Sequence, residues 1–364
     1  MAQQDRPEQP RLTVIDSLAA SPEPKGFWRT FVDGSAEIAI GAGVGTGFGI
    51  EAAKSVMTGD TTGRWWFFAA SLAGIALTVS GFWLRERLRK LELKRRQVRI
   101  GIVVTAADPS GSLAYAQRVD AQAERYSRAR CAVTIKSDVR LPPDGTASRE
   151  LIDALGDRTI EAMAIAEQLL PDAVGVDLIP TMRLHVAFWY GARLGHTHAR
   201  GVMVHELLQG NGNPSHFPAV PLKVEETLGG PLDVHALETI DGGDPTVTAL
   251  AVDLQAWGET FIAPVRKTCK EKGIGNLLHL SSPINEMPSE SLASAVGQIC
   301  RVWSQANLSK SARTGRHAVF LSGPVAIAVA LGARLASNDH GRWTAYTYNR
   351  ETSDYVHFPP IPST

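Results

Sequence analysis

A run of twenty residues without a charged side chain, Trp65–Leu84, constrains this chain more than any other feature. A helix that rises about 1.5 Å per residue crosses a hydrocarbon core of about 30 Å in roughly 20 residues. Tryptophan and phenylalanine lie at both ends of the run, as in helices whose rings sit at the two membrane–water interfaces. We therefore predict a membrane-spanning helix over about residues 65–84. The alternative is a buried helix of a large soluble core.

The residues after this run set its predicted direction. Residues 85–96 carry seven Lys or Arg and two Glu, whereas Arg64 is the only cation directly before the run. Because cytoplasmic flanks are enriched in Lys and Arg, we expect the C-terminal domain to lie in the cytoplasm. The same basic residues can also form a solvated helical stalk or lie against anionic lipid.

The residues before the run divide into a tail and a second apolar segment. Residues 1–25 are polar and contain four prolines, which predicts a loosely ordered tail. Residues 36–57 contain glycine at alternate positions between Glu37 and Glu51. Small residues let membrane helices pack closely, so this segment is interpreted as the first helix of a hairpin within residues 26–96. If this segment spans the membrane, the carboxylates of Glu37 and Glu51 would line a pore or pair helices. The alternative is that they extend into the headgroups and have no specific role.

Composition excludes several function classes. The chain has 37 basic and 37 acidic residues, so no global positive field argues for duplex nucleic acid as a partner. Its three cysteines are scattered without ligand spacing, which argues against a structural zinc site. The motifs HExxH, GxSxG and GxxxxGK[ST] are absent, so we expect no catalytic residues, no metal and no cofactor.

Beyond residue 97, apolar strands alternate with helices, which predicts parallel sheets covered on both faces. The expected strands are 97–107, 131–137, 172–181, 201–208, 248–255, 276–282, 317–322 and 342–348. The expected helices are 113–130, 148–170, 182–194, 259–272, 289–306 and 324–336.

The second half of this region repeats the first. The letters Gly-Ala-Arg-Leu at 191–194 recur at 332–335, and His-Phe-Pro at 216–218 recurs at 357–359, both 141 positions later. Leu151, Ala154 and Gly156 match Leu292, Ala295 and Gly297 at the same spacing. We therefore predict an α/β fold of two pseudo-symmetric Rossmann-like halves, 97–240 and 245–364.

Ligands of open parallel sheets bind beyond the carboxyl ends of the strands, where helix amino-termini favour anions. The expected strand ends carry small and polar residues, and Thr181 and Ser322 are equivalent at the spacing of 141. An ordinary helix-capping role is the alternative for each residue. By position, the candidates are Thr105, Asp108, Ser110, Thr181, Arg183, Ser281, Ser282, Ser322 and Gly323.

The stretches 277–297, 317–336 and 343–361 resemble the SAVED domain, a fusion of two CARF-like Rossmann units. The chain is most similar to the two-transmembrane SAVED effectors of bacterial cyclic-oligonucleotide-based anti-phage signalling (CBASS). The resemblance covers about residues 97–364 and implies that a cyclic tri- or tetranucleotide binds between the halves, at the candidates above, with Trp343 or Tyr348 stacking on bases.

The resemblance further implies a sensor rather than an enzyme. The ligand would drive homo-oligomerisation, and the clustered helices would contact lipid and disrupt the inner membrane in abortive infection. Two alternatives remain: a membrane-tethered Rossmann-like enzyme acting on a nucleotide, such as a ring nuclease or transferase, and a structural anchor without a ligand.

Overall fold

The computed structural model describes residues 11–15, 80, 83, 98–107, 113–141, 149–208, 215–226, 229–285, 287–349 and 354–358. Residues 1–17 and 98–364 form one compact unit, and residues 18–97 form a second. Both predicted membrane helices, 36–57 and 65–84, lie outside the described residues except for Ser80 and Trp83. Within the residues that are described, no helix is long and apolar enough to cross a membrane.

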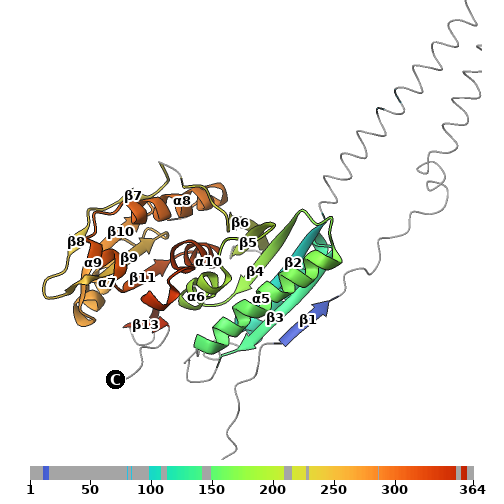
Figure 1. The fold of residues 1–364 in the computed structure, drawn as a ribbon, viewed down its shortest axis with the longest axis horizontal. Coiled ribbons are helices and arrows are strands. Elements are labelled where there is room, and N and C mark those ends of the chain that lie inside the picture. Colours follow the sequence, from blue (N-terminus) through green and yellow to red (C-terminus); the bar gives the residue numbers. More distant parts are fainter. Residues whose placement is uncertain are drawn as a thin grey trace, which may run out of the picture. The chain divides into compact units, whose positions relative to one another are not determined.

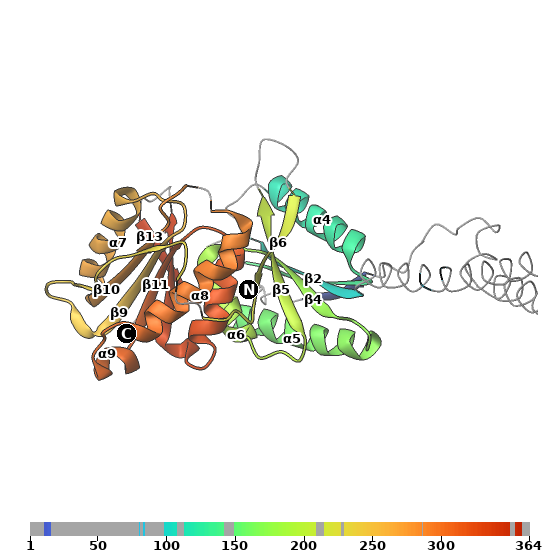
Figure 2. The same cartoon turned by 90° about the horizontal axis from the view of Figure 1, so that it is seen from above.

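The first half of the large unit is built on a six-stranded sheet of order β1-β3-β2-β4-β5-β6. Strands β2, β3, β4 and β5 are parallel, while β1 and β6 run antiparallel at the two edges. Helix α4 covers one face and helices α5 and α6 belong to the other (Figure 2). The bounds are β1 Arg11–Ile15, β2 Arg99–Ala107, α4 Leu113–Arg130, β3 Val133–Arg140, α5 Arg149–Leu169, β4 Gly175–Thr181, α6 Leu184–Leu194, β5 Gly201–Leu208 and β6 Ser215–Pro221.

The second half repeats this order in a seven-stranded sheet, β13-β12-β11-β9-β10-β7, with β8 also paired to β10. Its inner strands are parallel and β13, β7 and β8 are antiparallel (Figure 1). The bounds are β7 Asp233–Val234, β8 Glu238–Thr239, β9 Asp244–Asp253, α7 Glu259–Glu271, β10 Ile274–Ser281, α8 Ser289–Gln305, α9 Lys310–Thr314, β11 His317–Ser322, α10 Val325–Leu331, η1 Gly332–Ala336, η2 His340–Arg342, β12 Trp343–Asn349 and β13 Asp354–Phe358.

Alternate residues of each central strand belong to different cores. In β2, Ile100, Ile102 and Val104 join the largest core, whereas Val103 packs towards α4. The same largest core takes Leu250 and Val252 of β9, together with α5, α6, α8 and α10. Successive side chains of a strand point to opposite faces, so both sheets bury one face against a shared layer of helices. The parallel inner strands and the helices that connect them confirm the predicted Rossmann-like arrangement.

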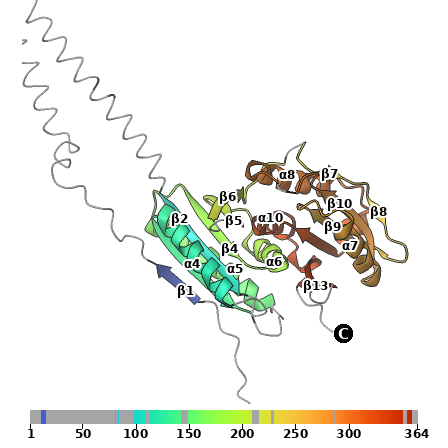
Figure 3. The same cartoon turned by 180° about the vertical axis from the view of Figure 1, so that it is seen from behind.

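Helix α6 packs directly against α10 and the π-helix η1 that continues α10 (Figure 3), at Gly191 of α6 and Gly332 of η1. A Cβ at Gly191 would lie 2.8 Å from the carbonyl carbon of Val329, and a Cβ at Gly332 would lie 2.8 Å from the carbonyl carbon of Phe188. The contact is reciprocal, because Phe188 and Val329 are themselves 141 positions apart. The repeated Gly-Ala-Arg-Leu therefore marks the close contact between the halves.

Strand registers show where the spacing of 141 holds. Val176 of β4 and His317 of β11 are equivalent residues of the two sheets and lie 141 positions apart. Their partners on the neighbouring strands, Ile100 of β2 and Thr248 of β9, are 148 positions apart. On the last strands, His216 lies opposite Leu207, whereas His357 lies opposite Tyr346. The His-Phe-Pro match is therefore displaced along its strand, although residues 216–218 lie on the antiparallel edge strand β6 and residues 357–358 on its counterpart β13.

The edges of the sheets differ most from the sequence prediction. Residues 11–15 form strand β1 on the edge of β3, although the tail was expected to be loosely ordered. Segments β7 and β8 cover the equivalent edge of β10, so residues 233–239 join the second sheet rather than the first half. Antiparallel strands β6 and β13 were also not expected. Each addition covers an edge that would otherwise expose unpaired backbone groups.

Candidate functional site

The carboxyl ends of β4 and β11 each lead within two residues into the helices that join the halves. Thr181 ends β4 and Ser322 ends β11, and they are equivalent by register. The residues at the helix starts are Arg183 and Pro324, and neither caps its helix with a side-chain hydrogen bond. The helix-capping alternative for Thr181 and Ser322 is therefore wrong, because both residues lie before the cap position.

Each central helix begins against the other half of the molecule. His185, in the first turn of α6, has its ring 6.2 Å from that of Phe358 on β13. On the other side, Glu206 of β5 accepts a hydrogen bond of 2.7 Å from the backbone amide of Ala326 in α10. The starts of α6 and α10 are thus both composite regions made by the two halves.

The two helix starts differ in charge. Arg183 is exposed at the start of α6, and its positive charge contributes to lowering the pKa of His185. At α10 the corresponding position is Pro324, and the Glu206 carboxyl group occupies the helix start instead. Burial raises the pKa of Glu206 to about 7, although hydrogen bonds from backbone amides oppose this rise. An incoming anion therefore meets a cation at α6 and a competing carboxyl group at α10.

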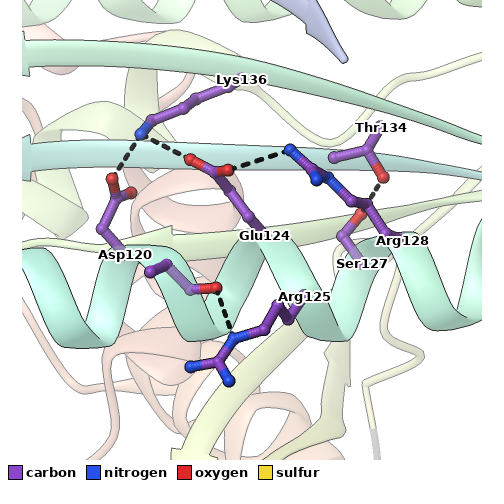
Figure 4. Close-up of polar contacts among 8 residues, drawn as sticks. Asp120, Glu124, Arg125, Ser127, Arg128, Thr134 and Lys136 are labelled. Atoms are coloured by element: carbon purple, nitrogen blue, oxygen red, sulfur yellow. Dashed lines mark hydrogen bonds and ion pairs between the residues drawn. The ribbon is translucent and has the colours of Figure 1, made fainter. Parts of the chain in front are cut away.

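In the first half, the Thr105 side chain helps to hold helix α4 on the sheet. Its hydroxyl is buried at the end of β2 and donates a hydrogen bond of 2.7 Å to Asp120 of α4. Asp120 also pairs with Lys136 of β3, which bonds Glu124 at 2.7 Å (Figure 4). This network fixes α4 to the sheet. Asp108 and Ser110, which follow Thr105, lie outside the described residues.

In the second half, the residue equivalent to Thr105 is Asp253 at the end of β9. It is fully buried, and its carboxylate accepts hydrogen bonds from the amides of Gln255 at 3.1 Å and Gly258 at 2.8 Å. The Gln255 side chain in turn accepts a bond of 3.0 Å from the hydroxyl of Ser322. Sequence reasoning missed Asp253, although an acidic residue closing an apolar strand could have indicated it.

The remaining small polar residues of this edge have defined partners. Ser281 hydrogen-bonds His235 at 2.9 Å, and the His235 ring stacks on His279 with centroids 4.3 Å apart. Buried Ser282 donates to the carbonyl of Ile284 at 2.8 Å and so shapes its own turn. Gly323 has a φ of 146°, and a Cβ there would lie 2.8 Å from that of Leu254. Only glycine fits this connection between Ser322 and α10.

The two predicted stacking residues lie at opposite ends of β12. Tyr348 is at the carboxyl end, 37% exposed, and packs edge-on against Tyr355. Trp343 begins the strand and is 3% exposed among Phe188, Trp303 and His317. Trp343 therefore does not lie with the other candidates. Its place at the start of the expected strand, away from the carboxyl edge, could have excluded it.

A second polar cluster lies inside the first half, away from these strand ends. Asp177 of β4 is 2% exposed and binds Arg99 at 2.6 Å and His205 at 3.1 Å. Burial alone would raise the pKa of Asp177, but hydrogen bonds from His205 and Arg99 lower it to about 2. Burial and the nearby Asp177 raise the pKa of Cys131 to about 12, so this thiol is a poor nucleophile. Across the described ranges no group of three or more His, Cys, Asp or Glu could hold a metal ion.

Comparison with known proteins gives only distant structural likenesses. No protein-family model matches the chain, and no curated relative matches it. The Cap4 SAVED/CARF-domain containing receptor of Acinetobacter baumannii, solved with the cyclic trinucleotide 3'3'3'-cAAA, aligns with a TM-score of 0.43 and 14% identity over 81% of this chain and 58% of that chain. The same receptor solved with 2'3'3'-cAAA aligns with a TM-score of 0.41 and 15% identity over 81% of this chain and 58% of that chain.

The Moraxella osloensis Cap4 SAVED/CARF-domain containing receptor aligns with a TM-score of 0.35 and 15% identity over 60% of this chain and 46% of that chain. This chain thus spans less than two thirds of each of these receptors.

Proposed function

We propose that this protein is a membrane-associated sensor that binds a cyclic tri- or tetranucleotide where the two Rossmann-like halves meet at the starts of α6 and α10. The observation that carries the proposal is the reciprocal contact of Gly191 with Val329 and of Gly332 with Phe188, which relates the halves by a pseudo-twofold axis. Such an axis brings equivalent strand ends into pairs, and a ring of similar nucleotide units presents equivalent groups to both.

The dimensions support a ligand larger than a mononucleotide. Helices α6 and α10 begin at Leu184 and Val325, four to seven residues before the residues of their close contact. This distance is about 8 Å along each axis, and packed helix axes lie about 8–10 Å apart, so the two starts are within about 20 Å of each other. A ring of three or four nucleotides can reach both starts at once.

The charges support an anionic ligand placed asymmetrically. The amino-terminal turn of α6 combines the positive end of the helix dipole with the exposed Arg183. A guanidinium can hold a phosphate through two parallel hydrogen bonds. Burial raises the pKa of the Glu206 carboxyl group at α10 to about 7, so this group repels an anion less at neutral pH than an ordinary glutamate does.

The effector step follows from the sequence. We propose that ligand binding favours association of several copies and that the apolar segments 36–57 and 65–84 then cluster in the inner membrane and disrupt it. A ligand shifts an assembly equilibrium only by the difference between its affinities for the two states, so the site must be coupled to a contact between copies. The family that the sequence resembles, the SAVED effectors, supports this role in anti-phage defence.

The proposal is tested with the full-length chain in detergent micelles, titrated calorimetrically with cyclic di-, tri- and tetranucleotides. We expect a tri- or tetranucleotide to bind and to be recovered intact after long incubation. Arg183→Ala should weaken that binding by about 10-fold or more, because hydrogen bonds to charged groups contribute about 1.5–3 kcal/mol. Arg158→Ala is the matched control, since Arg158 is an exposed arginine on α5 that pairs only weakly with Glu161 at 3.8 Å.

Three results would contradict the proposal. Binding of no cyclic nucleotide removes the sensor function. Cleavage of the ligand during incubation indicates the nucleotide-processing enzyme instead. Equal affinity of Arg183→Ala and Arg158→Ala places the ligand elsewhere. For the effector step, the ligand should increase the sedimentation coefficient of the chain and release dye from vesicles that contain it.

A further inference from the structure

The short loop between β9 and α7, residues 254–258, is held in an unusual conformation at the carboxyl edge of the second sheet. Ala256 has a φ of 51°, the only positive φ of a non-glycine residue within the described ranges, and Gly258 has a φ of 57°. A left-handed conformation is unfavourable for alanine, so it persists only where the surroundings impose it. Contacts with the surrounding residues therefore fix the conformation of this loop.

Buried groups at the ends of the neighbouring strands β9 and β11, Asp253 and Ser322, impose this conformation. The Asp253 carboxylate binds the amides of Gln255 and Gly258, at the two ends of the turn. The Gln255 side chain is tied to the hydroxyl of Ser322, and the amide of Leu254 donates to the Ser322 carbonyl at 2.9 Å. The loop is thus fixed to the end of β11, next to the start of α10.

The residue that this loop presents is Trp257. Its carbonyl accepts hydrogen bonds from the hydroxyl and the amide of Thr260, at 2.8 and 3.2 Å, so its backbone is fixed on the helix side as well. The residue is nevertheless 41% exposed. Because the backbone that carries this aromatic side chain is already fixed, the loop loses little further freedom when a flat partner packs on the side chain.

We propose that Trp257 is a base-stacking residue of the cyclic-oligonucleotide site, an inference that rests on the proposed function above. Trp257 lies at the carboxyl end of the central strand β9, and Tyr348 lies at the carboxyl end of β12, two strands away across β11. Both residues are exposed at the carboxyl edge of the sheet, where β11 also ends at Ser322. Any nucleobase has a π face, so this contact confers affinity for a nucleotide ring without selecting one base.

The test compares two substitutions at position 257 in the full-length chain, in micelles, titrated with the cyclic oligonucleotide that the wild-type protein binds. Base–aromatic stacking measured by alanine substitution predicts that Trp257→Ala weakens binding by about 5- to 150-fold. Trp257→Phe keeps a π face and should lose clearly less. Leu169→Ala is the control, because Leu169 is 62% exposed at the end of α5. Equal thermal midpoints check that all variants fold.

The outcomes separate this inference from the function on which it rests. If the wild-type protein binds a ring and Trp257→Ala binds it equally well, the stacking role is overturned while the sensor function stands. If Trp257→Phe loses as much affinity as Trp257→Ala, the aromatic face is not what the ligand contacts, and the inference is again overturned. If the wild-type protein binds no ring, the function and the inference fall together.

Discussion

Replacement of the two crossing glycines by alanine tests the pseudo-twofold contact. The atom nearest to a Cβ at Gly191 would be the Val329 carbonyl oxygen, with the carbonyl carbon at 2.8 Å and the Cα atom at 2.9 Å. Non-bonded carbons prefer about 3.5–4.0 Å, so helices α6 and α10 must separate by at least about 1 Å. The obstacle is backbone rather than a flexible side chain, and a gap of that size forfeits a quarter to a half of the dispersion energy of the contacts affected.

The net cost follows from two opposing effects. Overpacking of a well-packed core costs about 1–3 kcal/mol and more where backbone must move, while Gly→Ala in a helix regains about 1 kcal/mol of helix propensity. We therefore expect Gly191→Ala and Gly332→Ala each to lower the free energy of unfolding by about 2 kcal/mol. For a compact unit the size of residues 1–17 and 98–364, that corresponds to about 3–4 °C in the thermal midpoint.

The double variant gives a sharper test. A single outward movement of α6 from α10 relieves both clashes, because Gly332 meets Phe188 as Gly191 meets Val329. The double variant should therefore cost clearly less than the sum of the two single variants. The assay is thermal unfolding of the full-length chain followed by near-ultraviolet circular dichroism. Gly201→Ala is the control, because a Cβ at that glycine meets nothing within 4 Å. Single variants as stable as this control, or strictly additive costs, would refute the reasoning.

Three further substitutions test the charges that the fold buries. Burial, with smaller contributions from nearby cations, lowers the pKa of His185 from 6.5 to about 3. The folded state therefore keeps its full stability above pH 6.5 and loses stability as the pH falls, because the unfolded chain takes up a proton at this histidine. His185→Leu should reduce the loss of unfolding free energy between pH 7 and pH 5 by about 2 kcal/mol in urea titrations. Glu206 behaves oppositely, because burial raises its pKa from 4.5 to about 7 and stability falls as the pH rises through this window; Glu206→Gln should abolish a loss on the order of 2 kcal/mol between pH 5 and pH 8, and an unchanged pH profile would contradict its placement against Ala326. Asp177→Asn should cost about 3 kcal/mol at pH 7, since it leaves the partly buried Arg99 without its counter-charge, and a cost below 1 kcal/mol in urea unfolding would show that the pair is not needed.

Sequence periodicity predicted the strands and helices of both halves because most of them are buried on a regular face. Helix α6, for example, was expected over 182–194 and spans Leu184–Leu194. The repeated Gly-Ala-Arg-Leu predicted the duplication for a physical reason, since both copies must lack a Cβ where the helices touch. The uniform spacing of 141 failed at β2 and β9, mainly because the first helix of each half differs in length, α4 having 18 residues and α7 having 13.

The edges and the site were predicted less well. Strand β1 consists of five residues within a proline-bearing tail, and its pairing with β3 depends on a partner more than a hundred positions away in sequence. Among the site candidates, Thr181, Ser281 and Ser322 lie at strand ends as expected, but hydrogen bonds to His235 and Gln255 already engage the two serines. Trp257 was missed because its exposure depends on a turn that Asp253 fixes, and neither composition nor periodicity reports such a turn.

Hydrogen–deuterium exchange of the full-length chain in micelles, with and without a cyclic tri- or tetranucleotide that binds, tests the central claim most directly. Backbone amides after Thr181 at the start of α6 and after Ser322 at the start of α10 belong to different halves of the duplicated fold. Simultaneous protection of the amides of residues 183–187 and 325–328 is the result that a shared site predicts. Protection confined to one half, or absent from both segments while the ligand is bound, would contradict it.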